Sequence, residues 1–258
     1  MSLIRISKLW KSYGAKNVLE GLDFSIDANE FVTIVGASGC GKTTFLRMIL
    51  GEEEPSRGSI EIDGEKLIAE PGKDRGVVFQ RYSVFPHLTV LENVMLGLEF
   101  AGSKILCRGF GSVRRHWTQR CREMLDRVGL LASANDYPNA LSGGMQQRLA
   151  LSQSLVVAPR ILLLDEPFGA LDPGIRSDMH VLVRELHREL GLTVLMVTHD
   201  ISESFYLGTR VLVLDKIRID PHDPDLYGAN ITYDIPVRNP LDDIAGTFGE
   251  ERGVTQYE

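Results

Sequence analysis

Two stretches of this sequence carry residue types that could bind and cleave a phosphate anhydride. The first fits the pattern GxxxxGK[ST] at every position and comprises Gly36, Ala37, Ser38, Gly39, Cys40, Gly41, Lys42, Thr43 and Thr44. Glycines let backbone N–H groups converge on phosphate oxygens, and the start of a following helix adds its dipole. Lys42 would reach the β and γ phosphates of a nucleotide, and the Thr43 hydroxyl would bind Mg²⁺.

The second stretch is an apolar run that ends in two acids, from Ile161 to Glu166. Mg²⁺ prefers hard oxygen ligands, and hydrolysis needs a positioned water molecule. We therefore expect Asp165 to hold the metal, directly or through water, and Glu166 to orient or deprotonate the attacking water. Two acids at a solvated strand end are the plain alternative, which the phosphate loop in the same chain disfavours.

Short apolar runs must position these groups. They lie at residues 31–35, 77–79, 161–164, 193–197 and 211–214. Continuous runs of this kind are typical of parallel strands that are covered on both faces. Between Val90 and Val128 the spacing changes to that of helices and predicts a helical insertion. Another helix is predicted over residues 174–190, with Pro173 near its start and Gly191 just after its end.

The residues from Leu141 to Arg148 read Leu-Ser-Gly-Gly-Met-Gln-Gln-Arg and precede a helical pattern. The N-terminus of this helix would be a second anion-binding site in the chain, in addition to the phosphate loop. Here the chain resembles the ATP-binding cassette (ABC) ATPases, whose signature motif is LSGG followed by QQR. The resemblance extends from about Ile4 to Leu214 and is closest to the nitrate, sulfonate and taurine importer ATPases.

This resemblance implies roles for several residues. Tyr13 corresponds to a ring that stacks on adenine, Gln80 to a glutamine that touches Mg²⁺ and water, and His199 to a histidine that contacts the γ-phosphate. Asp172 lies in the loop that serves communication between paired subunits. The expected catalytic residues are Glu166, His199, Gln80 and Lys42, and the expected Mg²⁺ ligands are Thr43, Gln80 and Asp165.

Pairing of two cassettes is a further implication of the resemblance. Each ATP would lie between the phosphate loop of one subunit and the signature of the other. Ser142, Gly143, Gly144 and Gln146 would then complete the site of the partner, and a homodimer is expected. Binding of ATP joins the two surfaces and hydrolysis releases them.

The implied fold is α/β, a P-loop NTPase (RecA-like) core with a mainly parallel sheet, an antiparallel β portion and an α-helical subdomain. We expect an ATPase domain over residues 1–219, with the helical subdomain inserted at about 85–158, and an acidic C-terminal extension over 220–258. In the extension, the alternation of Ile231, Tyr233, Ile235 and Val237 predicts a strand on the edge of the domain, after a turn at 227–230.

Charge is concentrated in that extension. The chain has 28 Lys and Arg against 35 Asp and Glu, a net charge of −7. Residues 220–258 hold nine of the acids and only Arg238 and Arg252, so residues 1–219 are neutral. A protein that holds nucleic acid by bulk charge needs a net basic face, so no nucleic-acid partner is expected.

Cysteine usage and hydropathy bear on the compartment. Cys40, Cys107 and Cys121 have no paired spacing, which favours a reducing compartment over a disulfide framework. Cys40 is expected to act through its backbone rather than as a redox switch. We see no signal peptide and no run near the roughly 20 apolar residues of a membrane span. Any membrane role must then be peripheral, and the resemblance implies a position on the cytoplasmic face of the membrane, held through a permease.

The resemblance implies a subunit that hydrolyses ATP, with Mg²⁺, to energise import of a small solute of the nitrate, sulfonate, taurine or urea type. Its partners would be transmembrane permease subunits, a second ABC ATPase subunit and a separate solute-binding protein. An ABC ATPase of a lipid-handling or export system is an alternative, as is a soluble ABC ATPase outside transport. Neighbouring permease genes would discriminate between them.

The stretch from Lys104 to Arg122 departs most from the family pattern. It is longer than expected and holds Arg108, Arg114, Arg115, Arg120 and Arg122. A solvated helix face is the favoured interpretation, because charge runs usually are solvated. The alternative is a contact with a transmembrane partner or with anionic lipid headgroups.

Overall fold

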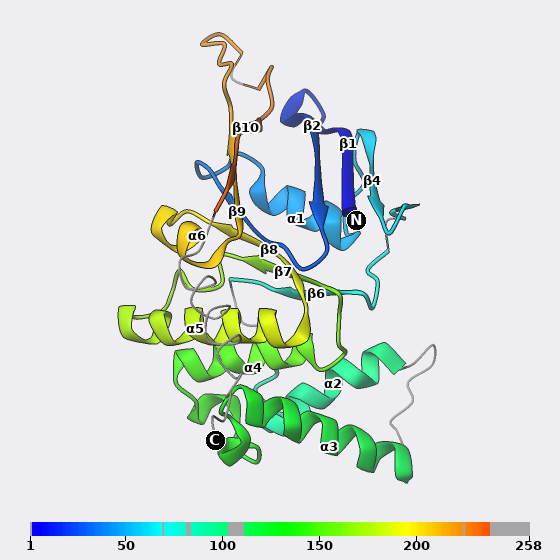
Figure 1. The fold of residues 1–258 in the computed structure, drawn as a ribbon, viewed down its shortest axis with the longest axis vertical. Coiled ribbons are helices and arrows are strands. Elements are labelled where there is room, and N and C mark those ends of the chain that lie inside the picture. The colour runs from blue at the N-terminus through cyan, green and yellow to red at the C-terminus, as the bar shows by residue number, and fades with distance from the viewer. Residues whose placement is uncertain (1, 69, 81–83, 103–110, 224, 238–258) are drawn as a thin grey trace, which may run out of the picture.

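The computed structural model describes residues 2–68, 70–80, 84–102, 111–223 and 225–237 (Figure 1). The elements of its first half are β1 (Ser2–Tyr13), β2 (Lys16–Asp27), β3 (Phe31–Val35), α1 (Lys42–Leu50), β4 (Arg57–Ile62), β5 (Glu65–Lys66), β6 (Arg75–Val78), α2 (Val90–Gly102) and α3 (Ser112–Arg127). Those of its second half are α4 (Gly143–Leu155), β7 (Ile161–Asp165), α5 (Pro173–Leu190), β8 (Thr193–Thr198), α6 (Ile201–Leu207), β9 (Arg210–Asp215) and β10 (Asn230–Pro236). Two short 3-10 helices, Leu131–Ser133 and Pro138–Ala140, lead into α4.

The main sheet has six strands in the order β10-β9-β3-β8-β7-β6. Pairing is parallel from β9 to β6, and β10 alone runs antiparallel, beside β9. A second, antiparallel sheet has the order β2-β1-β4-β5. The predicted α/β fold with a mainly parallel sheet and an antiparallel portion is thereby confirmed.

The main sheet has a hydrophobic core on each face, which explains why its strands carry apolar residues in succession. In β8, Val194 and Met196 point into the core shared with α2 to α6, whereas Leu195 and Val197 point into the core shared with α1 and the second sheet. Successive side chains of a strand face opposite sides, so a strand buried on both faces shows no polar alternation. Helix α1 lies between the two sheets (Figure 1).

The helices between β6 and β7 form a group of their own, in which α2 packs against both α3 and α4. Val94, Leu125 and Leu151 are buried in their common core. The helix predicted over residues 174–190 is confirmed as α5, in which Met179, Val183 and Leu186 are buried. Of the described helices, none combines the length and the apolar character needed to cross a membrane.

The predicted strand of the extension is confirmed as β10. Its register with β9 shifts between Ile231 and Tyr233, so Ile231 packs against the core while Tyr233 is exposed. The predicted turn at 227–230 is wrong in part, since Ala229 is extended and forms a parallel bridge with Leu19 of β2. Residues 238–258 lie outside the described residues.

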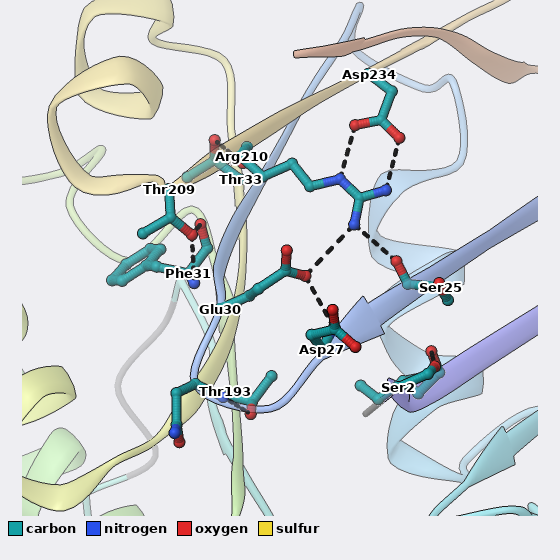
Figure 2. A network of polar contacts seen from close by, with 12 residues as sticks. Ser2, Ser25, Asp27, Glu30, Phe31, Thr33, Thr193, Thr209, Arg210 and Asp234 are labelled. Carbon is teal, nitrogen blue, oxygen red and sulfur yellow. Dashed lines mark hydrogen bonds and ion pairs between the residues drawn. The ribbon is translucent and has the colours of Figure 1, made fainter. Parts of the chain in front are cut away.

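Arg210 of β9 links β10 to β2 through hydrogen bonds (Figure 2). Arg210 Nε and Nη2 donate to the two carboxylate oxygens of Asp234 at 2.7 and 2.6 Å, and Nη1 donates to the carbonyl of Ser25 at 2.7 Å. The same Nη1 lies 3.4 Å from the Glu30 carboxylate. These bonds from Arg210 hold the pKa of Asp234 below its ordinary value of 3.8.

We predict that Asp234→Ala lowers the free energy of unfolding at pH 7 by about 1 kcal/mol, because a two-bond, partly solvated charge contact is lost. A lowered folded-state pKa means that this stabilisation is present above pH 3.8 and is lost as the pH falls through the folded pKa. Urea unfolding at pH 7 and at about pH 3 measures the change. An equal loss in Asp23→Ala, an exposed acid on β2, or a loss independent of pH, would contradict the prediction.

Candidate nucleotide site

The phosphate loop follows β3 and leads into α1, and two of its glycines are sterically required. A Cβ on Gly36 would lie 2.1 Å from the carbonyl oxygen of Leu214. Gly41, the N-cap of α1, has a φ of 102°, and a Cβ there would lie 2.8 Å from side-chain atoms of Val18 and Leu19. No other residue type fits this close approach and this left-handed backbone without strain.

The Lys42 side chain is enclosed by the loop. Its Nζ donates to the carbonyl oxygens of Gly36 and Ala37 at 2.8 and 2.9 Å, and the residue is buried. A buried ammonium is tolerated only where its donors are satisfied, which these carbonyls achieve. The loop thus concentrates positive charge at the end of β3.

An open hollow lies over the loop. Its lining comprises Tyr13, Lys16, Val18, Ser38, Gly39, Gly41, Lys42, Thr43, Thr44 and Glu166. Tyr13 stands at the rim, where its hydroxyl donates to Glu53 and Lys11 Nζ lies 4.8 Å from the ring centroid. Burial and the bond to Glu53 raise the pKa of Tyr13. This ring is held in place by its neighbours and keeps about half of its surface exposed.

The metal ligands predicted from the two motifs come together. Thr43 Oγ1 donates to Asp165 Oδ1 at 3.2 Å, which joins the start of α1 to the end of β7. Burial raises the pKa of Asp165, and the nearby Glu166 carboxylate acts in the same direction against the Thr43 bond. Asp165 is half-buried beside a second carboxylate, an environment that a bound cation would relieve. Mg²⁺ is usually held by one or two protein oxygens together with phosphates.

The predicted catalytic groups converge on one carboxylate. Gln80 Nε2 donates to Glu166 Oε2 at 3.4 Å, and His199 Nδ1 lies 3.5 Å from the same oxygen. These residues follow β6, β7 and β8, neighbouring parallel strands whose carboxyl ends share one edge of the sheet. Glu166 has a left-handed φ of 46°, a conformation that costs a non-glycine residue about 1–3 kcal/mol and persists where surroundings fix it.

The signature residues lie apart from this hollow. Ser142 is the N-cap of α4, and its hydroxyl accepts the N–H of Met145 at 3.4 Å. Ser142 and Gly143 are exposed, whereas Gly144 is buried, where a Cβ would lie 2.4 Å from Ile175 of α5. None of these residues lines the hollow around Lys42 in the described part of the chain.

Gln146 and Asp172 make hydrogen bonds within their own chain. The Gln146 amide donates to the carbonyls of Pro138 and Leu141 at 2.9 and 3.3 Å and so braces the segment before the signature. Asp172 is exposed at the start of α5, and its carbonyl accepts the N–H of Arg176 at 2.9 Å. The predicted contact of Gln146 with nucleotide and the role of Asp172 between subunits stay predictions.

A buried polar network behind His199 was not predicted. Glu203 of α6 accepts from the Thr198 hydroxyl and lies 2.8 Å from His180 Nε2 of α5. The Thr198 hydroxyl in turn accepts the N–H of Asp200 at 3.1 Å. Thr198 and Asp200 flank His199, so the network fixes the loop that carries the histidine. Asp200 and Glu203 have the spacing of a capping box, which indicates that a helix starts here. That pattern gives no indication that Glu203 contacts His180 of α5.

Two other predictions concern side chains near or beyond the site. Cys40 is half-buried, and burial raises the pKa of its thiol, which agrees with a backbone role. Arg114, Arg115 and Arg122 are exposed on α3 and line no part of the nucleotide hollow. Cys107 and Arg108 lie outside the described residues.

This fold and these strand-end groups define a P-loop nucleotide-binding domain of the cassette type. A family model described as ABC transporter matches residues 19–169. That span is more than half of the chain, and the chain belongs to the ABC transporter family.

Individual relatives agree with this assignment. The chain is 41% identical over 219 residues to a sulfate/thiosulfate import ATP-binding protein, CysA, of Bradyrhizobium diazoefficiens, and 43% identical over 216 residues to an aliphatic sulfonates import ATP-binding protein, SsuB 1, of Burkholderia lata. Each match covers 84% of this chain and 62% of the relative. The chain thus matches less than two thirds of the length of these relatives.

Among solved structures, the fold is similar to the dimeric structure of MJ0796, a bacterial ABC transporter cassette, with a TM-score of 0.74 and 33% identity over 92% of this chain and 99% of that one. The same cassette in a post-hydrolysis state bound to ADP and Pi gives a TM-score of 0.72 at 32% identity, with the same coverage.

We predict that Glu203→Ala lowers the free energy of unfolding by about 3 kcal/mol, because the change leaves the buried Thr198 hydroxyl and His180 ring without their acceptor. Urea unfolding measures the loss. Glu185→Ala, an exposed acid on α5, is the matched control and should cost less than about 0.5 kcal/mol. Similar losses in the two variants would show that the network does not stabilise the fold.

Proposed function

We propose that this chain binds ATP with Mg²⁺ and hydrolyses it as the energising subunit of a membrane importer for a small solute. The observation that carries this proposal is the position of Glu166, which lies at the mouth of the phosphate loop and is contacted by both Gln80 and His199. Family membership and the relatives named for import of sulfate and sulfonates support it.

In this proposal each part of the site acts on the triphosphate. Lys42 exchanges the carbonyls of Gly36 and Ala37 for β and γ phosphate oxygens, and the N–H groups of residues 36–44 surround the same phosphates. Thr43, Asp165 and Gln80 would hold Mg²⁺, which neutralises negative charge on the phosphates when bound. Tyr13 at the rim would stack on the adenine.

The chemical step follows from the Glu166 cluster. The Glu166 carboxylate accepts a proton from a water molecule, whose oxygen attacks the γ phosphorus as the bond to the β-phosphate oxygen breaks. ADP leaves, and the transferred phosphoryl group becomes inorganic phosphate. Gln80 and His199 hold the carboxylate oxygen in position, and His199 donates to the γ-phosphate, which places both residues beside the reacting atoms.

We further propose that two copies complete each site. Ser142 and Gly143 are exposed at the start of α4, next to the buried Gly144, and the N–H groups of this helix end suit the γ-phosphate of an ATP held by the partner. The dimeric state of the similar cassette supports this arrangement, with Gln146 and Asp172 at the contact. A nucleic-acid partner has no role in this proposal.

The transport partners follow from the relatives. Permease subunits would hold this chain at the cytoplasmic face of the membrane, and a separate solute-binding protein would deliver a sulfonate-like or related solute. A lipid-handling or export ABC system and an ABC ATPase outside transport are the alternatives. Co-purification with an importer-type permease would decide for import, and a membrane partner of the exporter type would decide against it.

We predict that Glu166→Gln slows ATP hydrolysis by at least about a hundredfold, because the amide cannot accept the proton of water. ATP binding should persist, so an ATP-bound dimer accumulates. Phosphate release and size-exclusion chromatography with ATP measure the two effects, with Glu185→Gln on the exposed face of α5 as the control. Undiminished hydrolysis in Glu166→Gln would refute the assigned role.

A further inference from the structure

The connection between β9 and β10 contacts the hairpin that borders the nucleotide hollow. We call Arg218 together with residues 225–229 the clasp. Its backbone joins the start of β2 through three main-chain hydrogen bonds, two of which make up one parallel bridge. Ala229 N donates to Val18 O at 2.9 Å, Glu20 N donates to Ala229 O at 2.8 Å, Asn17 N donates to Asp225 O at 2.9 Å, and Leu19 and Ala229 form a parallel bridge.

Side chains reinforce this backbone pairing. Glu20 binds the Arg218 guanidinium and accepts the N–H of Gly228 at 3.1 Å. Arg218 also lies over the ring of Tyr227, 4.4 Å from its centroid. Since the Glu20 side chain is only 14% exposed, water screens this contact weakly on the carboxylate side.

Asn17 adds a bridge between the clasp and β1. Its Nδ2 donates to the carbonyl of Leu226 at 2.6 Å, and its Oδ1 accepts from the Ser12 hydroxyl at the same distance. Ser12 directly precedes Tyr13, the ring at the rim of the hollow. One polar side chain therefore ties the clasp to the residue before the predicted adenine contact.

The start of β2, with which the clasp pairs, also forms part of the wall of the hollow. Lys16 and Val18 line it, and Val18 and Leu19 pack against Gly41 of the phosphate loop. The clasp thus contacts the same short stretch of β2 that borders the nucleotide hollow, and Asp225 Oδ1 of the clasp lies 3.7 Å from Nζ of the lining residue Lys16. β1 pairs with β4 over Ile4–Trp10, so the end of the β1–β2 hairpin beyond Trp10 is two-stranded and gains stability from the added pairing with the clasp.

We propose that the clasp positions the base-binding edge of the nucleotide site, and that its loss weakens binding of the adenosine part of ATP without weakening the grip of the loop on phosphate. This inference rests on the proposed function, because it concerns the affinity of that site. Arg218 and Gly228 are positioning residues in it, since neither lines the hollow. A preorganised edge avoids an ordering cost that a loose hairpin would add to each binding event.

Gly228→Ala is the sharpest test, because a Cβ there would lie 2.8 Å from the carbonyl carbon of Leu19 and 3.0 Å from the backbone nitrogen of Glu20, which forces the clasp off β2. Isothermal titration of the full chain with Mg²⁺ compares two probes, ATP and inorganic triphosphate. For Gly228→Ala we expect the Kd of ATP to rise about tenfold, the equivalent of one or two lost hydrogen bonds, and the Kd of triphosphate to change less than about twofold.

Arg218→Ala is a milder second variant that leaves the backbone pairing in place, and we expect about a threefold rise for ATP alone. Arg5→Ala, an exposed arginine near the other end of β1, is the matched control and should change neither Kd. Equal ATP affinity in wild type and both clasp variants, or an equal loss for ATP and triphosphate, would overturn the inference. Wild-type chain that binds neither probe would instead overturn the proposed function.

Discussion

The convergence of parallel strand ends on one edge of the sheet is the constraint on which the site depends. β3, β6, β7 and β8 run in the same direction, so the phosphate loop, Gln80, the Asp165–Glu166 pair and His199 emerge at the same edge. The two buried cores on opposite faces of the sheet fix those strands rigidly. Hydrogen bonds no longer than about 3.5 Å can then join side chains more than a hundred positions apart in the sequence, such as Thr43 and Asp165.

Much of this arrangement could be predicted from the sequence. The five apolar runs fall on β3, β6, β7, β8 and β9, because strands covered on both faces carry apolar residues in succession. The phosphate loop was predictable for a different reason, since Gly36 and Gly41 occupy positions where the backbone excludes other side chains. The roles of Gln80 and His199 came from the family resemblance, whereas their shared contact with the Glu166 carboxylate is visible only in the structure.

Other features left no local signal. The pairing of His180 with Glu203 joins two helices through single polar residues that no periodicity marks. The left-handed backbone of Glu166 depends on the surrounding fold, and its sequence gives no glycine to indicate it. The extension from residue 220 has prolines and acids that suggest weak structure, yet backbone pairing at Ala229 and the Arg210–Asp234 contact fix residues 225–237 onto the body. Two of the acids in the extension form ion pairs with the rest of the molecule, Asp225 with Lys16 and Asp234 with Arg210.

We propose that each nucleotide site is split between two copies of the chain, with the strand-end cluster on one copy and the exposed start of α4 on the other. The most direct measurement is the ATPase activity per chain as a function of chain concentration, at saturating ATP and Mg²⁺. If two copies complete each site, activity per chain rises with chain concentration and then levels off as pairing saturates. Constant activity per chain, down to concentrations at which sedimentation shows only monomers, would contradict the proposal.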